Sequence, residues 1–98
     1  MIIYVDIDET ICFYEGDRQY SLAIPNHTNI AKINKLYDEG HHITYWTARG
    51  SRSGIDWTSL TKNQLDSWGA KYHALRCDKP YYDIFVEDRS EKIENYLA

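Results

Sequence analysis

The stretch that most constrains the fold is a short apolar run that ends in two acidic residues. Residues 2–5 read Ile-Ile-Tyr-Val, which predicts a buried β-strand. Asp6 and Asp8 follow, and residues two apart in an extended chain point to the same side. Carboxylates held this close repel each other unless a cation separates them or one is protonated. A hard divalent cation is one solution. The other interpretation is an ordinary strand end with acidic turn residues.

Predicted strands and helices alternate along the rest of the chain. In order they are a hairpin flap over about 11–23, a helix between Pro25 and Gly40, a strand over 43–46, a helix from about Asp56 to Gly69, a strand over 72–75, a strand over 84–86 and a last helix capped by Ser90. The last helix would bury Ile93, Tyr96 and Leu97. This alternation predicts an α/β fold, in which about four parallel strands form a three-layer, Rossmannoid sheet with helices on both faces.

Length and charge narrow the class of protein. With 98 residues, the chain is expected to form a single domain, 1–98. A net charge of −4 argues against broad binding to nucleic acid or to an anionic membrane. No apolar run reaches transmembrane length, so we expect a cytoplasmic protein. Cys12 and Cys77 lack zinc-ligand spacing and are expected to be reduced thiols.

Chemically useful side chains follow three of the predicted strands. They are Asp6 and Asp8 after the first strand, Thr47, Ala48 and Arg49 after the second, Lys79 on the loop before the fourth, and Glu87 and Asp88 after the fourth. Because the carboxyl ends of parallel strands meet at one edge, we expect these residues to converge there. Acids, a threonine and cations together suit phosphoryl transfer: a carboxylate attacks phosphorus, cations neutralise charge, and an acid protonates the leaving oxygen.

Each residue taken alone has a simpler interpretation. Thr47 ends a strand, Lys79 is a solvated loop lysine, and Arg49 is a surface charge. Glu87 and Asp88 interact electrostatically with the start of the last helix. Only the shared sheet edge favours the functional interpretation.

Together, these residues resemble the four motifs of the haloacid dehalogenase (HAD) superfamily. The motifs are Asp6-x-Asp8-x-Thr10 after a strand, Thr47, Lys79 and the pair Glu87-Asp88, and they span essentially the whole chain. The stretches 33–41 and 46–50 are similar to small HAD phosphatases associated with capsule and other surface polysaccharide biosynthesis. Since only residues 11–23 are available above the site, the resemblance implies a HAD-like fold without a cap domain.

The resemblance also implies roles for individual residues. Asp6 would be the nucleophile of a phosphomonoester hydrolase that forms an aspartyl-phosphate, and Asp8 the general acid and base. Thr47, Ala48, Arg49 and Lys79 would bind the phosphoryl group. Mg²⁺ would be bound by the Asp6 carboxylate, the Asp8 main-chain carbonyl and Asp88, with Glu87 close by or acting through water.

The substrate expected from this resemblance is a sugar phosphate or a similar small phosphorylated metabolite. An open site would favour bulky substrates, or a wall donated by a neighbouring subunit in a homo-oligomer. Two alternatives stay open. A nucleic-acid 3′-end phosphatase fits an open site, although the acidic charge counts against it. A non-hydrolytic, receiver-like phospho-acceptor domain also uses acids, a threonine and a lysine, but its acceptor lies on a later strand.

Overall fold

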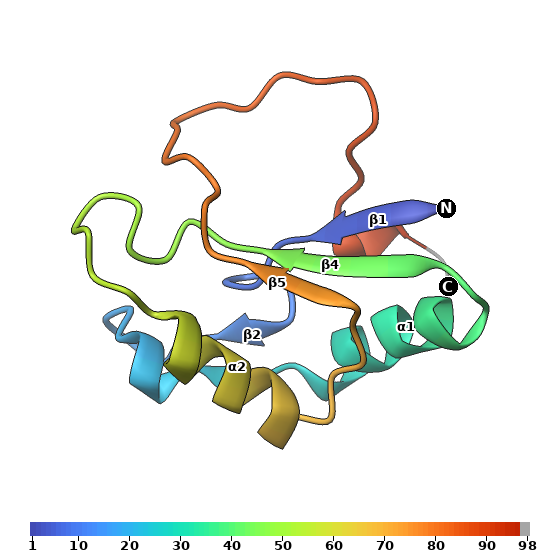
Figure 1. The fold of residues 1–98 in the computed structure, drawn as a ribbon, viewed down its shortest axis with the longest axis horizontal. Helices are drawn as coiled ribbons and strands as arrows, with labels where there is room; N and C mark the ends of the chain where they lie inside the picture. Colours follow the sequence, from blue (N-terminus) through green and yellow to red (C-terminus); the bar gives the residue numbers. More distant parts are fainter. Residues whose placement is uncertain (97–98) are drawn as a thin grey trace.

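Three parallel strands form the sheet that organises the molecule, seen in the middle of Figure 1. The structure, a computed structural model, describes residues 1–96. β1 (Ile2–Val5) pairs with β4 (His42–Trp46), and β4 pairs with β5 (Ala74–Arg76), all in parallel. The chain is therefore a small α/β protein. The predictions of a second strand beside the first and of a third near residues 72–75 are confirmed.

Both helices pack on one face of this sheet (Figure 1). They are α1 (His27–Asp38) and α2 (Thr58–Ser67). Alternate strand residues point toward them, and the fully buried ones include Ile43 and Tyr45. These contact a core that contains Ile33 of α1 and Leu65 of α2. Two crossovers of the same hand that step in the same direction place their helices on the same side. The prediction of helices on both faces is therefore wrong for the part of the chain described.

The opposite face of the sheet carries exposed side chains instead of a helix. Tyr4 is 48% exposed and meets Trp46 edge to face, with ring centroids 5.5 Å apart. The Arg76 guanidinium lies 5.9 Å from the centre of the Tyr4 ring and 5.8 Å from that of Trp46. Its Nη1 also donates to the Tyr4 hydroxyl at 3.2 Å. Two aromatic rings in edge-to-face contact and an arginine therefore line this face.

The ends of both helices lie close to where the sequence placed them. Asn26 caps α1, because its side-chain oxygen accepts a hydrogen bond of 3.1 Å from the Asn29 backbone. Gly40 follows α1 with a φ of 95°, which favours glycine. At the start of α2, Asp56 accepts from the Thr58 backbone at 2.9 Å. Local hydrogen bonds at both helix starts and the glycine after α1 thus account for the agreement.

The predicted flap is present as a hairpin. β2 (Cys12–Phe13) and β3 (Ile24–Pro25) pair in antiparallel fashion at its base. Between them the chain turns through Gly16 and a short 3₁₀ helix, Tyr20–Leu22. Figure 1 shows β2 and the following segment, drawn in blue, beside α2.

The structure also contradicts the predictions of a fourth strand and of a last helix. Residues 77–92 run as an irregular loop above the sheet (Figure 1), and within it Ile84, Phe85 and Val86 are 79%, 53% and 89% exposed. A short apolar run has strand propensity, but a strand also needs a neighbour, and none pairs with it here. Instead of a full helix, the end of the described chain forms one 3₁₀ turn, Ile93–Asn95. Leu97, predicted to face inward from that helix, lies outside the described residues.

Within residues 1–96, neither helix is long and apolar enough to cross a membrane.

Candidate active site

A pocket of about 630 Å³ opens beyond the carboxyl ends of β1 and β4. All six residues predicted to act in catalysis or phosphate binding line it: Asp6, Asp8, Thr47, Ala48, Arg49 and Lys79. They come from the end of β1, the end of β4 and the loop after β5. The parallel sheet therefore gathers these residues as expected.

Asp6 is the more accessible of the two acids at the end of β1. Its side chain is 45% exposed, and one carboxylate oxygen lies 3.8 Å from the Lys79 ammonium. The same oxygen accepts a hydrogen bond of 2.9 Å from the Ile7 backbone. Partial burial raises the pKa of Asp6, and Lys79 opposes that rise. Asp6 is thus an accessible carboxylate beside a cation, as a nucleophile toward phosphorus requires.

Asp8 forms a buried ion pair with Arg49. The guanidinium donates from Nε at 3.1 Å to one carboxylate oxygen and from Nη2 at 2.8 Å to the other. The Arg49 side chain has no exposed surface, and that of Asp8 is 10% exposed. This two-point contact fixes the orientation of the Asp8 carboxylate.

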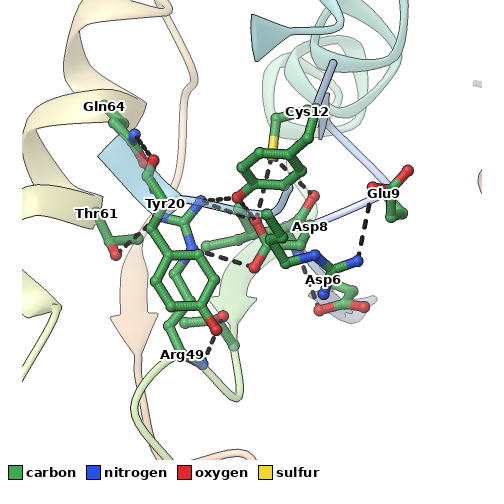
Figure 2. A network of polar contacts seen from close by, with 12 residues as sticks. Asp6, Asp8, Glu9, Cys12, Tyr20, Arg49, Thr61 and Gln64 are labelled. Atoms are coloured by element: carbon green, nitrogen blue, oxygen red, sulfur yellow. Dashed lines mark hydrogen bonds and ion pairs between the residues drawn. The ribbon is translucent and has the colours of Figure 1, made fainter. Parts of the chain in front are cut away.

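Arg49 also joins this acid to the second helix. Its Nη1 donates to Thr61 at 3.1 Å and to Gln64 at 2.6 Å, both on α2. Its Nη2 reaches the Tyr14 hydroxyl at 3.2 Å. Figure 2 shows the guanidinium between these α2 side chains and Asp8, with the Tyr20 ring against it.

An arginine has five N–H donors, and here each has a protein acceptor. To bind a phosphoryl group as well, Arg49 would have to give up one of these bonds. The structure thus gives Arg49 the role of positioning Asp8. Its predicted role in phosphate binding stays a prediction.

The surroundings of Asp8 keep it ionised. Burial raises its pKa, but hydrogen bonds from Arg49 and Tyr14 lower it by more, so the net pKa lies below the usual value. Tyr14 donates to Asp8 at 2.5 Å, and the Cys12 thiol lies 3.5 Å away. Burial, followed by the charge of Asp8, raises the pKa of Cys12 to about 12. Burial and the raised pKa thus disfavour the thiolate of Cys12 at neutral pH.

Thr47 and Lys79 are tied together by backbone contacts. The Lys79 N–H donates to the Thr47 carbonyl at 3.2 Å. Thr47 is 1% exposed, and its hydroxyl oxygen accepts from the Arg49 backbone at 3.1 Å. The Lys79 ammonium lies between two rings, 5.6 Å from that of Trp46 and 5.4 Å from that of Tyr82. Lys79 is thus held at the mouth of the pocket near Asp6.

Glu87 and Asp88 do not line this pocket. Both are exposed, and their contacts are local: Glu87 accepts from the Arg89 backbone at 2.8 Å, and Asp88 lies 3.9 Å from the Arg89 side chain. No three His, Cys, Asp or Glu side chains among residues 1–96 are grouped so that they could hold a metal. The expected Mg²⁺ ligand set is therefore not assembled, because the segment before these acids is not a strand of the sheet.

The chain matches no family model and no curated protein. A solved structure does match. The chain shares its fold with a protein from Vibrio cholerae. That crystal structure superposes with a TM-score of 0.84, covering 95% of this chain and 84% of the other, at 21% sequence identity. At this identity the likeness concerns the fold.

Sequence reasoning missed the polar residues that surround Arg49. The sequence pattern places Tyr14 in the flap and Thr61 and Gln64 within a helix, and it assigns none of them a role in the site. The sequence contains one signal. On a helix, Thr61 lies on the same face as the apolar Leu65, and Gln64 lies next to it. A polar side chain that is buried at such a position needs a hydrogen-bond partner. Thr61 has no exposed surface in the structure.

Proposed function

We propose that this protein is a phosphomonoester hydrolase of the HAD type, without a cap domain, that works in the cytoplasm through an aspartyl-phosphate on Asp6. One observation carries the proposal: a single pocket contains an accessible carboxylate beside Lys79 and a second carboxylate oriented by Arg49. A sugar phosphate or a similar small metabolite is the proposed substrate.

The reaction proceeds in two steps. In the first, an Asp6 oxygen attacks phosphorus while the bond from phosphorus to the ester oxygen breaks, and Asp8 gives its proton to that leaving oxygen. In the second, water attacks phosphorus and loses a proton to Asp8. The bond between phosphorus and the Asp6 oxygen breaks, so phosphate is released and the Asp6 carboxylate is restored. The Lys79 ammonium offsets the negative charge of the phosphoryl group beside Asp6.

The two acids have pKa shifts opposite to those that the first step needs. Attack requires Asp6 ionised and Asp8 protonated, whereas the pKa of Asp6 is raised and that of Asp8 lowered. A bound phosphate dianion adds negative charge beside Asp8 and raises its pKa. Substrate binding thus promotes the protonated form of Asp8 that the first step uses.

Mg²⁺ belongs to this proposal through the HAD resemblance alone. Bound near Asp6, it would neutralise charge on the phosphoryl group. However, no three His, Cys, Asp or Glu side chains among residues 1–96 are grouped as a metal site, and Glu87 and Asp88 lie outside the pocket described above. The steps above are therefore assigned only to side chains of the pocket.

Replacing the nucleophile tests the proposal. Asp6→Asn keeps the shape of the side chain but removes the attacking charge, so turnover should fall by about 10³-fold or more. Phosphate release from para-nitrophenyl phosphate and from a panel of sugar phosphates, with and without Mg²⁺, measures the effect. Asp38→Asn is the matched control, because Asp38 forms an exposed ion pair with Lys71. Wild-type turnover in Asp6→Asn would remove Asp6 from this role.

The same panel separates the alternatives. Faster release from 3′-phosphorylated oligonucleotides than from sugar phosphates would favour a nucleic-acid end phosphatase. A single stoichiometric phosphorylation without sustained phosphate release would favour a receiver-like domain.

A further inference from the structure

The candidate pocket gathers positive charge in an acidic chain. The chain carries 11 Lys and Arg residues against 15 Asp and Glu. Nevertheless, four cations but only two acids line the pocket: Arg18, Arg49, Arg52 and Lys79, with Asp6 and Asp8. The pocket is thus built for a ligand with substantial negative charge.

Three of these cations already have an acidic partner. Arg49 pairs with Asp8, Lys79 lies near Asp6, and Arg18 lies 3.6 Å from Glu9. Within residues 1–96, the structure gives Arg52 no carboxylate partner. Arg52 is therefore the cation of the pocket whose charge a ligand can meet directly.

Arg52 is nevertheless held in place. Its guanidinium carbon lies over the Tyr81 ring, 4.6 Å from the ring centre, as in a cation–π contact. The N–H groups of a guanidinium in such a contact can still meet an oxyanion at two points.

The loops that carry this pair are fixed to each other. The Ser51 hydroxyl donates to the Lys79 carbonyl at 2.5 Å, and the Gly54 N–H donates to the Gly50 carbonyl at 2.8 Å. Gly50 has a φ of 84°, and a Cβ there would lie 2.1 Å from the Ile55 carbonyl oxygen. The loop around Arg52 thus has a defined shape and is tied to the loop that carries Lys79.

Aromatic rings complete the walls of the same pocket. Tyr20 and Trp57 meet edge to face with centroids 5.1 Å apart, and Tyr81 and Tyr82 lie on the loop that carries Lys79. Such rings contact the apolar face of a sugar or another small ring. A volume of about 630 Å³ lies in the range of small-metabolite sites.

We propose that Arg52, supported by Tyr81, is a second anion subsite, so that the substrate carries another anionic group besides the phosphoryl ester that reaches Asp6. A phosphorylated sugar acid and a sugar bisphosphate share this chemistry. This inference rests on the proposed function, because it names the substrate class of the same pocket.

Matched pairs of substrates test the subsite. Glucose 6-phosphate is compared with 6-phosphogluconate, which adds a carboxylate, and fructose 6-phosphate with fructose 1,6-bisphosphate, which adds a phosphate. We expect Arg52→Gln to lower kcat/KM for the members with two anionic groups by about 10- to 100-fold, mainly through KM, because a charge-assisted contact is lost. The kcat/KM values for glucose 6-phosphate, fructose 6-phosphate and para-nitrophenyl phosphate, which lack the second anionic group, should stay nearly unchanged.

The controls separate a subsite from a general effect of charge. Arg52→Lys should recover part of the loss, and Arg89→Gln, which removes an exposed cation outside this pocket, should leave all pairs unchanged. The pair with the larger response identifies carboxylate or phosphate as the second group. An equal effect of Arg52→Gln on both members of both pairs would overturn the subsite.

A binding measurement keeps the inference independent of turnover. If the wild-type protein hydrolyses none of these esters, the proposed function fails. The affinities for each pair, followed by tryptophan fluorescence, then decide the subsite. Tighter binding of the doubly anionic members that is lost in Arg52→Gln supports it, and equal affinities overturn it.

Discussion

At the scale of single residues, Arg49 and Arg52 show how position decides the role of a side chain. They are three residues apart on the same loop. Arg49 is buried with a protein acceptor for every N–H group, whereas Arg52 is exposed and lies over the Tyr81 ring. Because a buried charge is tolerated only when it is paired, the partners of Arg49 are part of the fold. Gly50 after Arg49 favours Arg49 over Arg52 as a ligand contact, but it does not predict the buried acceptors of Arg49.

Removing the buried arginine should destabilise the protein. Arg49→Met keeps an unbranched apolar stem but leaves Asp8 without its cation, so the free energy of unfolding should fall by about 3–5 kcal/mol. Asp8→Leu added to Arg49→Met should recover part of this loss, because no unpaired charge then remains. Urea denaturation at pH 7 measures both, with Arg76→Met, which breaks an exposed pair, as the control. A loss no larger than that of the control would contradict the buried ion pair.

The lowered pKa of Asp8 predicts a pH dependence of stability. A carboxyl group with a folded-state pKa below its unfolded value of 3.8 stabilises the fold above that pH. The contribution disappears as the pH falls through the folded-state pKa. Asp8→Asn should therefore be less stable than the wild type at neutral pH, and the difference should shrink below about pH 3.8. Denaturation curves at several pH values test this, and a difference independent of pH would contradict it.

At the scale of elements, local sequence patterns predicted the helices and strands whose formation depends mainly on nearby residues. β1, β4, α1 and α2 follow from apolar periodicity, from Asn26 as a cap and from glycines after the helices. Strand pairing depends on distant segments, so a short apolar run such as 84–86 does not reveal its partner. Among the described residues, nothing pairs with the outer edge of β1. A cavity of about 1130 Å³ adjoins that edge and includes Phe85 and Glu87 in its lining.

The proposed Mg²⁺ dependence makes a prediction for this segment. If Glu87 and Asp88 help to hold the ion near Asp6, residues 84–86 must move toward the outer edge of β1. We therefore expect fast amide hydrogen exchange over 84–88 without metal, and slower exchange when Mg²⁺ is added. Mass spectrometry of peptides from this region measures it, with the helix α1 as the internal control. Mg²⁺-dependent turnover with unchanged exchange would show that these acids do not join the site.

At the scale of the whole molecule, the sheet edge was easier to predict than its details. The carboxyl ends of parallel strands lie at one edge of the sheet, so the order of the elements predicts that Asp6, Asp8, Thr47 and Lys79 lie close together. The structure places all four in one pocket. The contacts of Tyr14, Thr61 and Gln64 depend on how the flap and α2 pack, which periodicity does not encode. Assembly into a homo-oligomer stays a prediction.

The contrast between a chain of charge −4 and a cationic pocket predicts sensitivity to salt. Screening shortens the reach of the pocket charges to about 8 Å at physiological ionic strength. Raising NaCl should therefore lower kcat/KM for the substrates with two anionic groups several-fold, and less steeply in Arg52→Gln than in the wild type. Initial rates across a salt series measure this, with potassium glutamate replacing chloride to exclude specific anion binding. Equal salt slopes in both proteins would contradict a role for Arg52 in attraction.

The contacts of Arg49 with α2 have one further consequence for the proposed enzyme. Thr61 and Gln64 touch no reacting atom, yet they hold the arginine that sets the proton affinity of Asp8. Fraying of this helix on heating would free the guanidinium and change that affinity at once. Catalysis would then decline at temperatures where the parallel sheet is still intact.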